Sequence, residues 1–455
     1  MRALVIGTGE VGFAIIEALS SEGADVVAID VNEHSLEAAR NLFDIQTITG
    51  SGSNPVNLKN AGVSSADMVV AVTNSDEVNM VACKLASKEA PYAIRVARIR
   101  ETAFLNDEFL TMENGFWITH PINPERVSAK RIFEIIKVPF AVDVATLWDD
   151  MSLIGLKIPK GSPAIGKTFA DLRTMAPDLK MLVTTRIRDA ISVVPGGDND
   201  IKEGDTLYVV INPVDYQKMA KVFELPFKSA KKIIIAGGDG IGKTLATTMD
   251  KMSNVNVKLI EENEALAGEL AESFARVLVL QGSATDENLL VEENIKDCDI
   301  FVAALKDEEA NVMAALNAKR LGALKVMVLT SKPSYIPIIE NSGIDVVLSP
   351  QALAIGTILQ HIRKGSVKSV TPYSHSGKAE IIQFEALESA KAVGRPLKDV
   401  SIPKNAIVGM IVRNKKAMIP GGNDIIEPGD SVFMFAEKSA IPKLEKLMAV
   451  GFSFF

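Results

Sequence analysis

The residues best suited to chemistry form a glycine-rich turn near the start of the chain. The turn follows an apolar strand and precedes a helical pattern, and the next apolar strand ends at Asp30. Backbone amides in such a turn, together with the helix N-terminus, attract the phosphates of a dinucleotide. The Asp30 carboxylate can accept hydrogen bonds from both hydroxyls of a ribose. The candidate ligand contacts in the turn are Gly7, Thr8, Gly9, Glu10, Val11 and Gly12.

The charge of Asp30 narrows the choice of ligand. A carboxylate at this position repels a 2′-phosphate, so NAD or NADH is expected in preference to NADP. An adenosine ligand such as ATP or ADP would satisfy the same acid. The sequence leaves these two classes of ligand open.

Further candidate contacts follow later strands of the same half. Residues 69–72 form an apolar strand, and Thr73 and Asn74 come at its carboxyl end, where open parallel sheets bind ligands. Asn74 could equally cap the helix that follows. Arg98 and Arg100 end the next strand, where either side chain could meet a phosphate, a neighbouring subunit or solvent.

The pattern of strand, glycine turn, helix, strand and acid occurs twice. Its second copy begins at Lys232 and ends at Glu261, and corresponding residues of the two halves lie 229 to 232 positions apart. A repeat of this length indicates duplicated domains rather than a solenoid. Asp239 replaces the middle glycine, where its bulk and charge oppose a pyrophosphate, so occupancy of the second site stays open. The second set of candidates is Gly237, Gly238, Asp239, Gly240, Ile241, Gly242 and Glu261.

Each half ends in a different kind of module. Strands alternating with helices give way to short strands bounded by glycine, proline and asparagine, which is typical of a small α+β unit. Turns rich in proline, glycine and aspartate at 194–205 and 419–430 mark these units. We predict an α/β protein with two tandem Rossmann-like parallel-sheet domains, each followed by a small α+β domain. The predicted domains are residues 1–123, 124–227, 231–350 and 351–455.

Two amphipathic helices are expected where a large module meets a small one, at 124–137 and 351–364. Each is either a plain connector or a crossover helix that packs against a partner subunit. Prolines flank the first of these helices, at Pro121 and Pro139, and we place the hinge between large and small modules there.

Residues 237–244 also match the phosphate-binding P-loop pattern G-x-x-x-x-G-K-T. Residues 161–168 match it too, although Pro163 and the absence of a preceding apolar strand oppose a phosphate cradle there. Because the former segment falls in register with the first glycine turn, Lys243 and Thr244 are expected to open an ordinary helix. The ATPase interpretation is therefore the weaker one.

Residues suited to catalysis are missing from the sequence pattern. None of the five tyrosines is followed four positions later by lysine, and no histidine stands with a carboxylate in a setting for proton transfer. We expect no enzyme activity, and an NAD-dependent oxidoreductase is the alternative. The histidines are scattered, which gives no support for a metal site: His34, His120, His361 and His375.

Composition and charge exclude several functions. A chain of 455 residues with 47% hydrophobic and 23% charged residues is an ordinary globular protein of several domains. Its net charge of −8 opposes binding to nucleic acid. No apolar run reaches the roughly 18 residues that span a bilayer, so a soluble protein without a signal peptide is expected. Cys83 and Cys298, the two cysteines of the sequence, lie in apolar segments and form neither a Cys-x-x-Cys motif nor a disulfide framework, which favours a reducing cytoplasm.

Taken together, these residues resemble the potassium-transport nucleotide-binding domains, also called regulator-of-potassium-conductance (RCK) domains. The likeness covers nearly the whole chain and includes the first glycine turn with Asp30 and both Pro-Gly-Gly turns. By this resemblance the ligand contacts of the first half include residues 7–11, and those of the second include Glu261. Leu329 or Thr330, near the position of Arg98, departs from the family pattern. Five further residues belong to segments that carry the likeness and are candidate ligand contacts: Gly50, Ser51, Thr73, Asn74 and Arg98.

The resemblance implies a regulatory subunit of a potassium-uptake system. Such a subunit binds NAD or NADH, or ATP or ADP, without turnover. It assembles into a ring of four chains on the cytoplasmic face of a membrane-embedded potassium-translocating subunit. The ligand changes the shape of the ring and so the potassium flux, by the difference between its affinities for two shapes.

Overall fold

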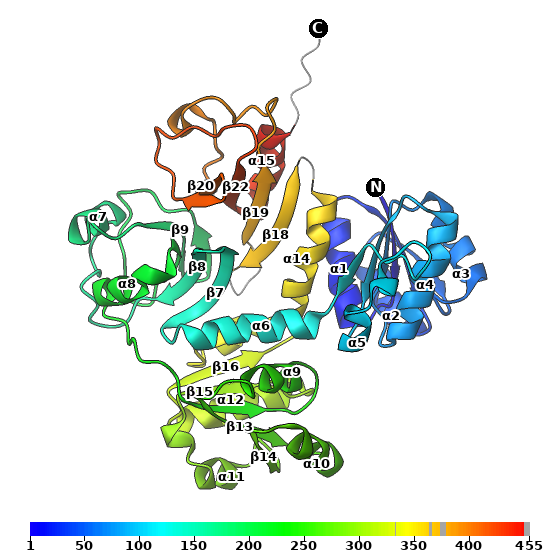
Figure 1. Cartoon of the computed structure of the whole chain (residues 1–455), viewed down its shortest axis with the longest axis horizontal. Coiled ribbons are helices and arrows are strands. Elements are labelled where there is room, and N and C mark those ends of the chain that lie inside the picture. The colour runs from blue at the N-terminus through cyan, green and yellow to red at the C-terminus, as the bar shows by residue number, and fades with distance from the viewer. Residues whose placement is uncertain (333, 364–365, 374–378, 450–455) are drawn as a thin grey trace. The chain divides into compact units, whose positions relative to one another are not determined.

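The computed structural model describes residues 1–332, 334–363, 366–373 and 379–449 (Figure 1). The described chain divides into two compact units. The first contains residues 1–127 together with residues 350–362, and the second contains residues 128–349 and the chain from residue 363 onward. A segment from late in the sequence is thus an integral part of the first unit.

The first unit is built around a parallel sheet with the strand order β3-β2-β1-β4-β5-β6. Along β1, Ile6 packs into the core on one face of the sheet and Val5 into the core on the other. Both faces are buried, which explains the nearly continuous apolar strands of the sequence. The strands are β1 (Arg2–Ile6), β2 (Asp25–Asp30), β3 (Gln46–Thr49), β4 (Met68–Ala71), β5 (Ile94–Arg98) and β6 (His120–Ile122). The helices are α1 (Glu10–Ser21), α2 (Glu33–Leu42), α3 (Pro55–Asn60), α4 (Asp76–Glu89), α5 (Thr102–Leu105) and, from the second half, α14 (Pro350–Ile362).

Helix α14 follows the second parallel sheet in sequence but packs against α1 of the first (Figure 1). Ile358 of α14 enters the same core as Ile15 and Ile16 of α1. The Gln351 Nε2 amide donates to Glu10 Oε2 over 3.1 Å. The segment predicted as an amphipathic helix is therefore a crossover helix within one chain; Lys364 lies outside the described residues.

The second unit contains, within its described residues, a parallel sheet of order β14-β13-β12-β15-β16-β17 and two antiparallel sheets. The antiparallel orders are β10-β9-β11-β8-β7 and β18-β19-β22-β20-β21. Two parallel sheets and two small antiparallel sheets confirm the predicted fold class. Strands of the parallel sheet are β12 (Lys232–Ala236), β13 (Asn256–Glu261), β14 (Leu278–Gln281), β15 (Ile300–Ala303), β16 (Lys325–Leu329) and β17 (Val346–Leu348). Its helices are α9 (Gly240–Met249), α10 (Glu264–Ser273), α11 (Glu287–Glu292), α12 (Glu308–Arg320) and α13 (Ile336–Glu340).

The antiparallel sheets share a core in which the Tyr208 and Tyr373 rings lie 5.0 Å apart. Strands of the first are β7 (Ala141–Trp148), β8 (Met151–Lys157), β9 (Met181–Arg188), β10 (Ile191–Val193) and β11 (Thr206–Ile211). Strands of the second are β18 (Val367–Tyr373), β19 (Ala379–Glu385), β20 (Ala406–Arg413), β21 (Lys416–Met418) and β22 (Ser431–Glu437). The accompanying helices are α6 (Pro124–Lys137), α7 (Phe169–Met175), α8 (Tyr216–Phe223) and α15 (Ile441–Met448).

Helix α6 begins in the first unit and ends in the second. Its residue Ile132 belongs to the same hydrophobic core as Ile235 of the second parallel sheet. Just after α6, the backbone oxygens of Pro139 and Ala141 accept hydrogen bonds from the buried Lys325 ammonium group. This helix of the first half therefore packs with the sheet of the second half.

Each Pro-Gly-Gly turn links two strands of an antiparallel sheet and ends in a buried acid. Asp205 accepts two hydrogen bonds from the Arg188 guanidinium, over 2.7 and 2.8 Å. Asp430 accepts two from Arg413 in the same way, over 2.9 and 2.7 Å. Bidentate pairs of this kind pin the turns to the sheets, so the acids that end these turns are structural.

Asn79 of α4 joins the ends of two neighbouring strands. The side chain is fully buried, and its amide donates to the backbone oxygens of Thr73 and Arg98 over 3.2 and 2.9 Å. Its oxygen accepts from the Thr73 amide over 2.9 Å. Asn311 of α12 repeats this arrangement with Leu305 and Leu329. One buried amide in each half thus shapes the loop after the fourth strand.

We predict that Asn79→Ala destabilises the first unit by about 2 to 3 kcal/mol, because it leaves buried backbone groups of Thr73 and Arg98 without a partner. Urea unfolding followed by circular dichroism measures the loss. Asn74→Ala is the control, since the Asn74 side chain is exposed and its removal should change stability by less than about 0.5 kcal/mol. Equal stabilities of the two variants would contradict the role given to Asn79.

The His120 and His361 rings, far apart in sequence, lie 3.9 Å apart in the first unit. Burial lowers the pKa of His361 to about 4, with a smaller contribution from His120, and burial also lowers the pKa of His120. At neutral pH both rings are therefore uncharged when α14 is packed against β6 and α1.

We predict that acid loosens the first unit. A histidine in the unfolded chain has a pKa of about 6.5, whereas the pKa of the packed His361 is lowered to about 4. The stabilisation is complete above about pH 6.5 and is lost as the pH falls from there toward about 4. Urea midpoints between about pH 8 and pH 5 should fall for the wild type and fall less for His361→Gln. His34→Gln, at an exposed site, should retain the wild-type profile.

Candidate nucleotide site

The first glycine turn lies between β1 and α1, at the point where the strand order of the sheet reverses. A Cβ atom on Gly7, whose φ is +97°, would lie 2.9 Å from the Thr73 amide nitrogen. A Cβ atom on Gly12 would overlap the Gly7 carbonyl oxygen. The fold itself requires these two glycines, because helix and strand approach closely there.

Gly9 is different, because the backbone around it does not require glycine. Its φ and ψ of −66° and −173° are open to any residue. A Cβ atom placed there would have no described heavy atom within 4 Å beyond its chain neighbours. Gly9 is the N-cap of α1 and has no side chain to accept from the first amides of the helix. The turn therefore leaves space above the amides where an anionic group can approach.

Thr8 lies beside this space and is 4% exposed. Its amide donates to Asp30 Oδ2 over 2.5 Å. Its hydroxyl oxygen is buried and has no hydrogen-bond partner among the described residues. The bond from the Thr8 amide to Asp30 fixes the turn that leads into α1.

Asp30 ends β2 and holds the turn through both oxygens of its carboxylate. One carboxylate oxygen accepts from Thr8 and the other from the Asn32 amide over 2.8 Å. Each oxygen keeps a lone pair that a ribose hydroxyl can use. The backbone oxygen of Asp30 accepts from the Gly50 amide over 2.7 Å, which brings Gly50 and Ser51 to the same sheet edge. Ser51 makes a 2.8 Å hydrogen bond with the Ser53 hydroxyl.

Thr73 and Asn74 follow the carboxyl end of β4, the strand next to β1 in the sheet. The Thr73 hydroxyl donates to Asn79 and to the Ser75 backbone oxygen, so this side chain shapes the loop. Asn74 is exposed, and its backbone oxygen accepts from the Arg100 guanidinium. The interpretation of Asn74 as the helix cap is wrong: Ser75 caps α4 by accepting from the Val78 amide over 3.1 Å.

Arg98 makes an ion pair with Glu125 at the start of α6. The two side chains are 15% and 17% exposed. Arg98 Nε and Glu125 Oε2 are buried and lack a hydrogen-bond partner among the described residues. The pair connects the carboxyl end of β5 to the helix that runs into the second unit.

Sequence reasoning missed Asn79 and Asp76, which organise the loops after β4 and β5. Asp76 is 7% exposed and accepts from the Arg100 and Glu101 amides, each over 2.9 Å. The repeat offers a signal for Asn79, because Asn311 occupies the corresponding helix position in the second half. A polar residue at matching positions of two buried helix faces indicates a shared hydrogen-bonding role.

The second glycine turn repeats the backbone of the first. Gly237 has a φ of +105°, and a Cβ atom on Gly242 would overlap the Gly237 carbonyl oxygen. Glu261 ends β13 and accepts from the Gly238 amide over 2.7 Å and the Asn263 amide over 2.8 Å. Gly240 and Ile241 open α9. The structure thus brings the predicted residues of each half to the same edge of their own sheet.

Asp239 distinguishes the second turn from the first. It is the N-cap of α9, and its carboxylate accepts from the Gly240 amide over 2.8 Å. The other carboxylate oxygen lies 2.8 Å from the Lys306 ammonium nitrogen. Lys243 and Thr244 lie inside α9, where the Thr244 hydroxyl donates to the Gly240 oxygen over 2.8 Å. These residues continue an ordinary helix, as expected.

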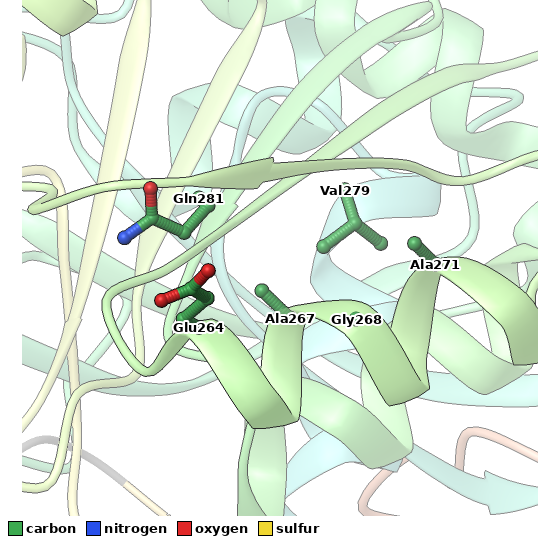
Figure 2. Close-up of a pocket in the computed structure, with 6 residues that line it drawn as sticks. All are labelled: Glu264, Ala267, Gly268, Ala271, Val279 and Gln281. Atoms are coloured by element: carbon green, nitrogen blue, oxygen red, sulfur yellow. The ribbon is translucent and has the colours of Figure 1, made fainter.

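A surface groove of about 310 Å³ lies between α10 and β14 (Figure 2). Figure 2 shows Glu264 and Gln281 facing one another at one end of the groove. In the first half the Arg40 guanidinium occupies the corresponding place and donates to Glu33 and Thr47 over 2.7 and 2.9 Å. The groove contains none of the predicted contacts and lies on the flank of its domain. Its lining residues are Glu264, Ala267, Gly268, Ala271, Val279 and Gln281.

In the described part of the chain, side-chain groups that could hold a metal ion and helices that could span a membrane are both absent. There, no group of three or more histidine, cysteine, aspartate or glutamate side chains is placed to hold a metal ion. Among the same residues, none of the helices has the length and apolar character that crossing a bilayer requires.

Comparison with known proteins agrees with this architecture. The family model described as the TrkA-N domain matches residues 3–112 and 233–350, and that of the TrkA-C domain matches residues 153–224 and 381–449. The GsuK channel bound to NAD is similar in structure with a TM-score of 0.61 at 14% identity, covering 98% of this chain and 78% of that one. At this identity the likeness shows the fold.

Relatives of similar length share much more of the sequence. The Trk system potassium uptake protein TrkA of Halomonas elongata is 34% identical over 460 residues, with all of both chains covered. The protein of the same name from Haemophilus influenzae is 33% identical over 98% of each chain. On its sequence, its paired domains and its length, the chain belongs to the TrkA family.

Proposed function

We propose that this chain is the nucleotide-binding regulatory subunit of a Trk-type potassium-uptake system, with NAD or NADH, or ATP or ADP, bound at the first glycine turn. The relatives bear the name of potassium uptake proteins, and a structural neighbour is a channel bound to NAD. The observation that carries the proposal is the open space beside Gly9 at the start of α1, in a turn whose Thr8 amide donates to the Asp30 carboxylate. The relatives are not named as enzymes, and we propose binding without turnover.

Each residue of the first turn has a proposed task toward the ligand. The amides from Gly9 to Val11 would face the phosphates, with the partial positive charge at the start of α1. Asp30 would accept from the ribose hydroxyls with the lone pairs that its backbone donors leave. Gly12 permits the close approach of helix to strand on which that arrangement depends. The bound nucleotide would supply negative charge and two sugar hydroxyls, and the chain would supply their partners.

Further contacts would come from neighbouring loops at the same edge. Gly50 and Ser51 lie beside Asp30, and Asn74 is exposed after the carboxyl end of β4. Thr73 can contact a ligand through its backbone, since its hydroxyl is engaged with Asn79. Arg98 would sense ligand charge indirectly, because its guanidinium is already paired with Glu125.

The Arg98–Glu125 pair suggests how binding would reach the rest of the molecule. Glu125 lies in the first turn of α6, and the boundary between the compact units falls within that helix, after Val127. We propose that the hinge lies in the segment from Pro121 to Pro139. A ligand shifts the hinge only by the difference between its affinities for two shapes, and about 1 to 3 kcal/mol of coupling suffices for a switch.

The proposed partner is a membrane-embedded potassium-translocating subunit of the Trk type. The chain would assemble into a ring of four copies on the inner face of the cell membrane and remain in the cytoplasm. We propose that the functional domains are residues 1–123, 124–227, 231–350 and 351–455, in the order RCK N-terminal, C-terminal, N-terminal and C-terminal. The crossovers of α6 and α14 mean that these sequence domains differ from the compact units.

We predict that Gly9→Ala weakens nucleotide binding at least about tenfold, or about 1.4 kcal/mol, while the protein stays folded and loses no more than about 1 kcal/mol of stability at this N-cap. The new methyl group meets open space in the fold but stands where the phosphates must approach the backbone. Isothermal titration with NAD, NADH, ATP and ADP measures binding, and thermal unfolding measures stability. Asp30→Ala is less informative, because Asp30 also holds the turn.

Gly268→Ala is the matched control. Gly268 likewise has open space where a methyl group would stand, on α10 of the second half and outside the unit that contains Gly9. This variant should bind nucleotide as the wild type does. Unchanged affinity in Gly9→Ala would place the phosphates elsewhere, and wild-type protein without affinity for any of the four nucleotides would refute the proposed function.

A further inference from the structure

The two glycine turns differ in how the amides at the start of the following helix are satisfied. In the first, Gly9 offers no side chain, so an acceptor must come from outside the turn. In the second, Asp239 accepts from the Gly240 amide over 2.8 Å. A carboxylate at a helix N-terminus interacts favourably with the partial positive charge there. The second turn therefore has its own side-chain acceptor for the first amide of the helix, and the first turn has none.

A second substitution supplies the counterion. Lys306 follows Leu305, whose amide donates to Asn311 as the Thr73 amide donates to Asn79. Lys306 thus stands at the position that Asn74 has in the first half. Its ammonium nitrogen lies 2.8 Å from Asp239 Oδ2. Hydrogen bonding to Lys306, followed in importance by the Gly240 amide among the favourable contacts, lowers the pKa of Asp239, so the carboxylate is ionised at neutral pH.

Space is also distributed differently in the two turns. Nothing described lies within 4 Å of a Cβ atom on Gly9, apart from its chain neighbours, whereas the Asp239 side chain occupies the corresponding volume. At the preceding position, a Cβ atom on Gly238 would lie 2.6 Å from Leu270 and 2.9 Å from Glu261 Oε2. The first turn accommodates the whole Thr8 side chain there. The second turn is the more closely packed.

We infer that the Asp239 carboxylate and the Lys306 ammonium group replace the ligand phosphates in the second turn, so that the chain binds a single nucleotide, in its first half. This inference rests on the proposed function and specifies which of the two duplicated sites serves it. Asp239 excludes a diphosphate by its charge and volume. Lys306 neutralises Asp239; because both side chains are largely exposed, the pair itself adds little to stability.

It follows that the two parallel-sheet domains differ in their response to nucleotide. The first parallel-sheet domain has an opening that a nucleotide completes, and its state depends on the nucleotide concentration. The second domain retains the same backbone with an internal anion and stays in one state. Nucleotide sensing then belongs to the unit that contains α1 and α14, and the second unit receives the signal through α6.

The test is the number of nucleotides bound by the full chain. Isothermal titration with ADP and with NADH should give one per chain for the wild type. Asp239→Gly opens the second turn and leaves Lys306 to attract phosphate, so two per chain are expected. The reciprocal variant, Gly9→Asp with Asn74→Lys, builds the same pair in the first turn and should bind none. Combining all three substitutions should return the count to one.

Lys306→Ala is the control for the lysine alone. It leaves the Asp239 carboxylate in place, so one nucleotide per chain is expected. Circular dichroism and thermal unfolding establish that each variant is folded. Should Asp239→Gly lose its fold, the reciprocal variant in the first turn decides the question by itself.

The outcomes separate the inference from the proposed function. Two nucleotides per wild-type chain would overturn the inference and leave the function standing. A folded Asp239→Gly variant that still binds one, or a reciprocal variant that binds as the wild type does, would also overturn it. A wild-type chain that binds neither ADP nor NADH would remove the proposed function and the inference together.

Discussion

The carboxylate that closes the second strand of each parallel sheet is the constraint on which both glycine turns depend. Asp30 accepts from the Thr8 amide, and Glu261 accepts from the Gly238 amide. Each bond joins the turn to the neighbouring strand, so the amides at the start of the following helix have a fixed direction. The acid proposed to accept from sugar hydroxyls is thus also part of the scaffold, and the site is organised before any ligand arrives.

The two halves share this backbone scaffold and differ in the side chains at the glycine turns. The buried asparagines Asn79 and Asn311 hold the same loop in both halves, and the fold cannot lose them without leaving backbone groups unpaired. Gly9 and Asp239 are free to differ, because the backbone there is extended and the neighbouring volume is open in the first turn. The two turns therefore differ at a position where the fold accepts either residue.

Exchange of helices makes the two halves interdependent. Helix α14 completes the first parallel-sheet domain through Ile358 and Gln351, and α6 contributes Ile132 to the core that contains the second parallel sheet. A buried ion pair between Arg131 of α6 and Asp143 of β7, 2.8 Å apart, fixes the helix to the first small sheet. Removal of either partner would leave a buried charge, a costly change. Helix α6 is therefore fixed both to the first small sheet and to the core of the second parallel sheet.

The sequence by itself determined the duplication, the order of large and small modules, and the glycine turns with Asp30 and Glu261, because strand periodicity, glycine spacing and a closing acid are local patterns. It also showed Asp239 as an exception. Only the tertiary structure decided that α14 crosses to the first half, that His120 meets His361, and that Lys306 neutralises Asp239. Those contacts join residues far apart in the chain, and their partners are set by packing, which no local spacing encodes.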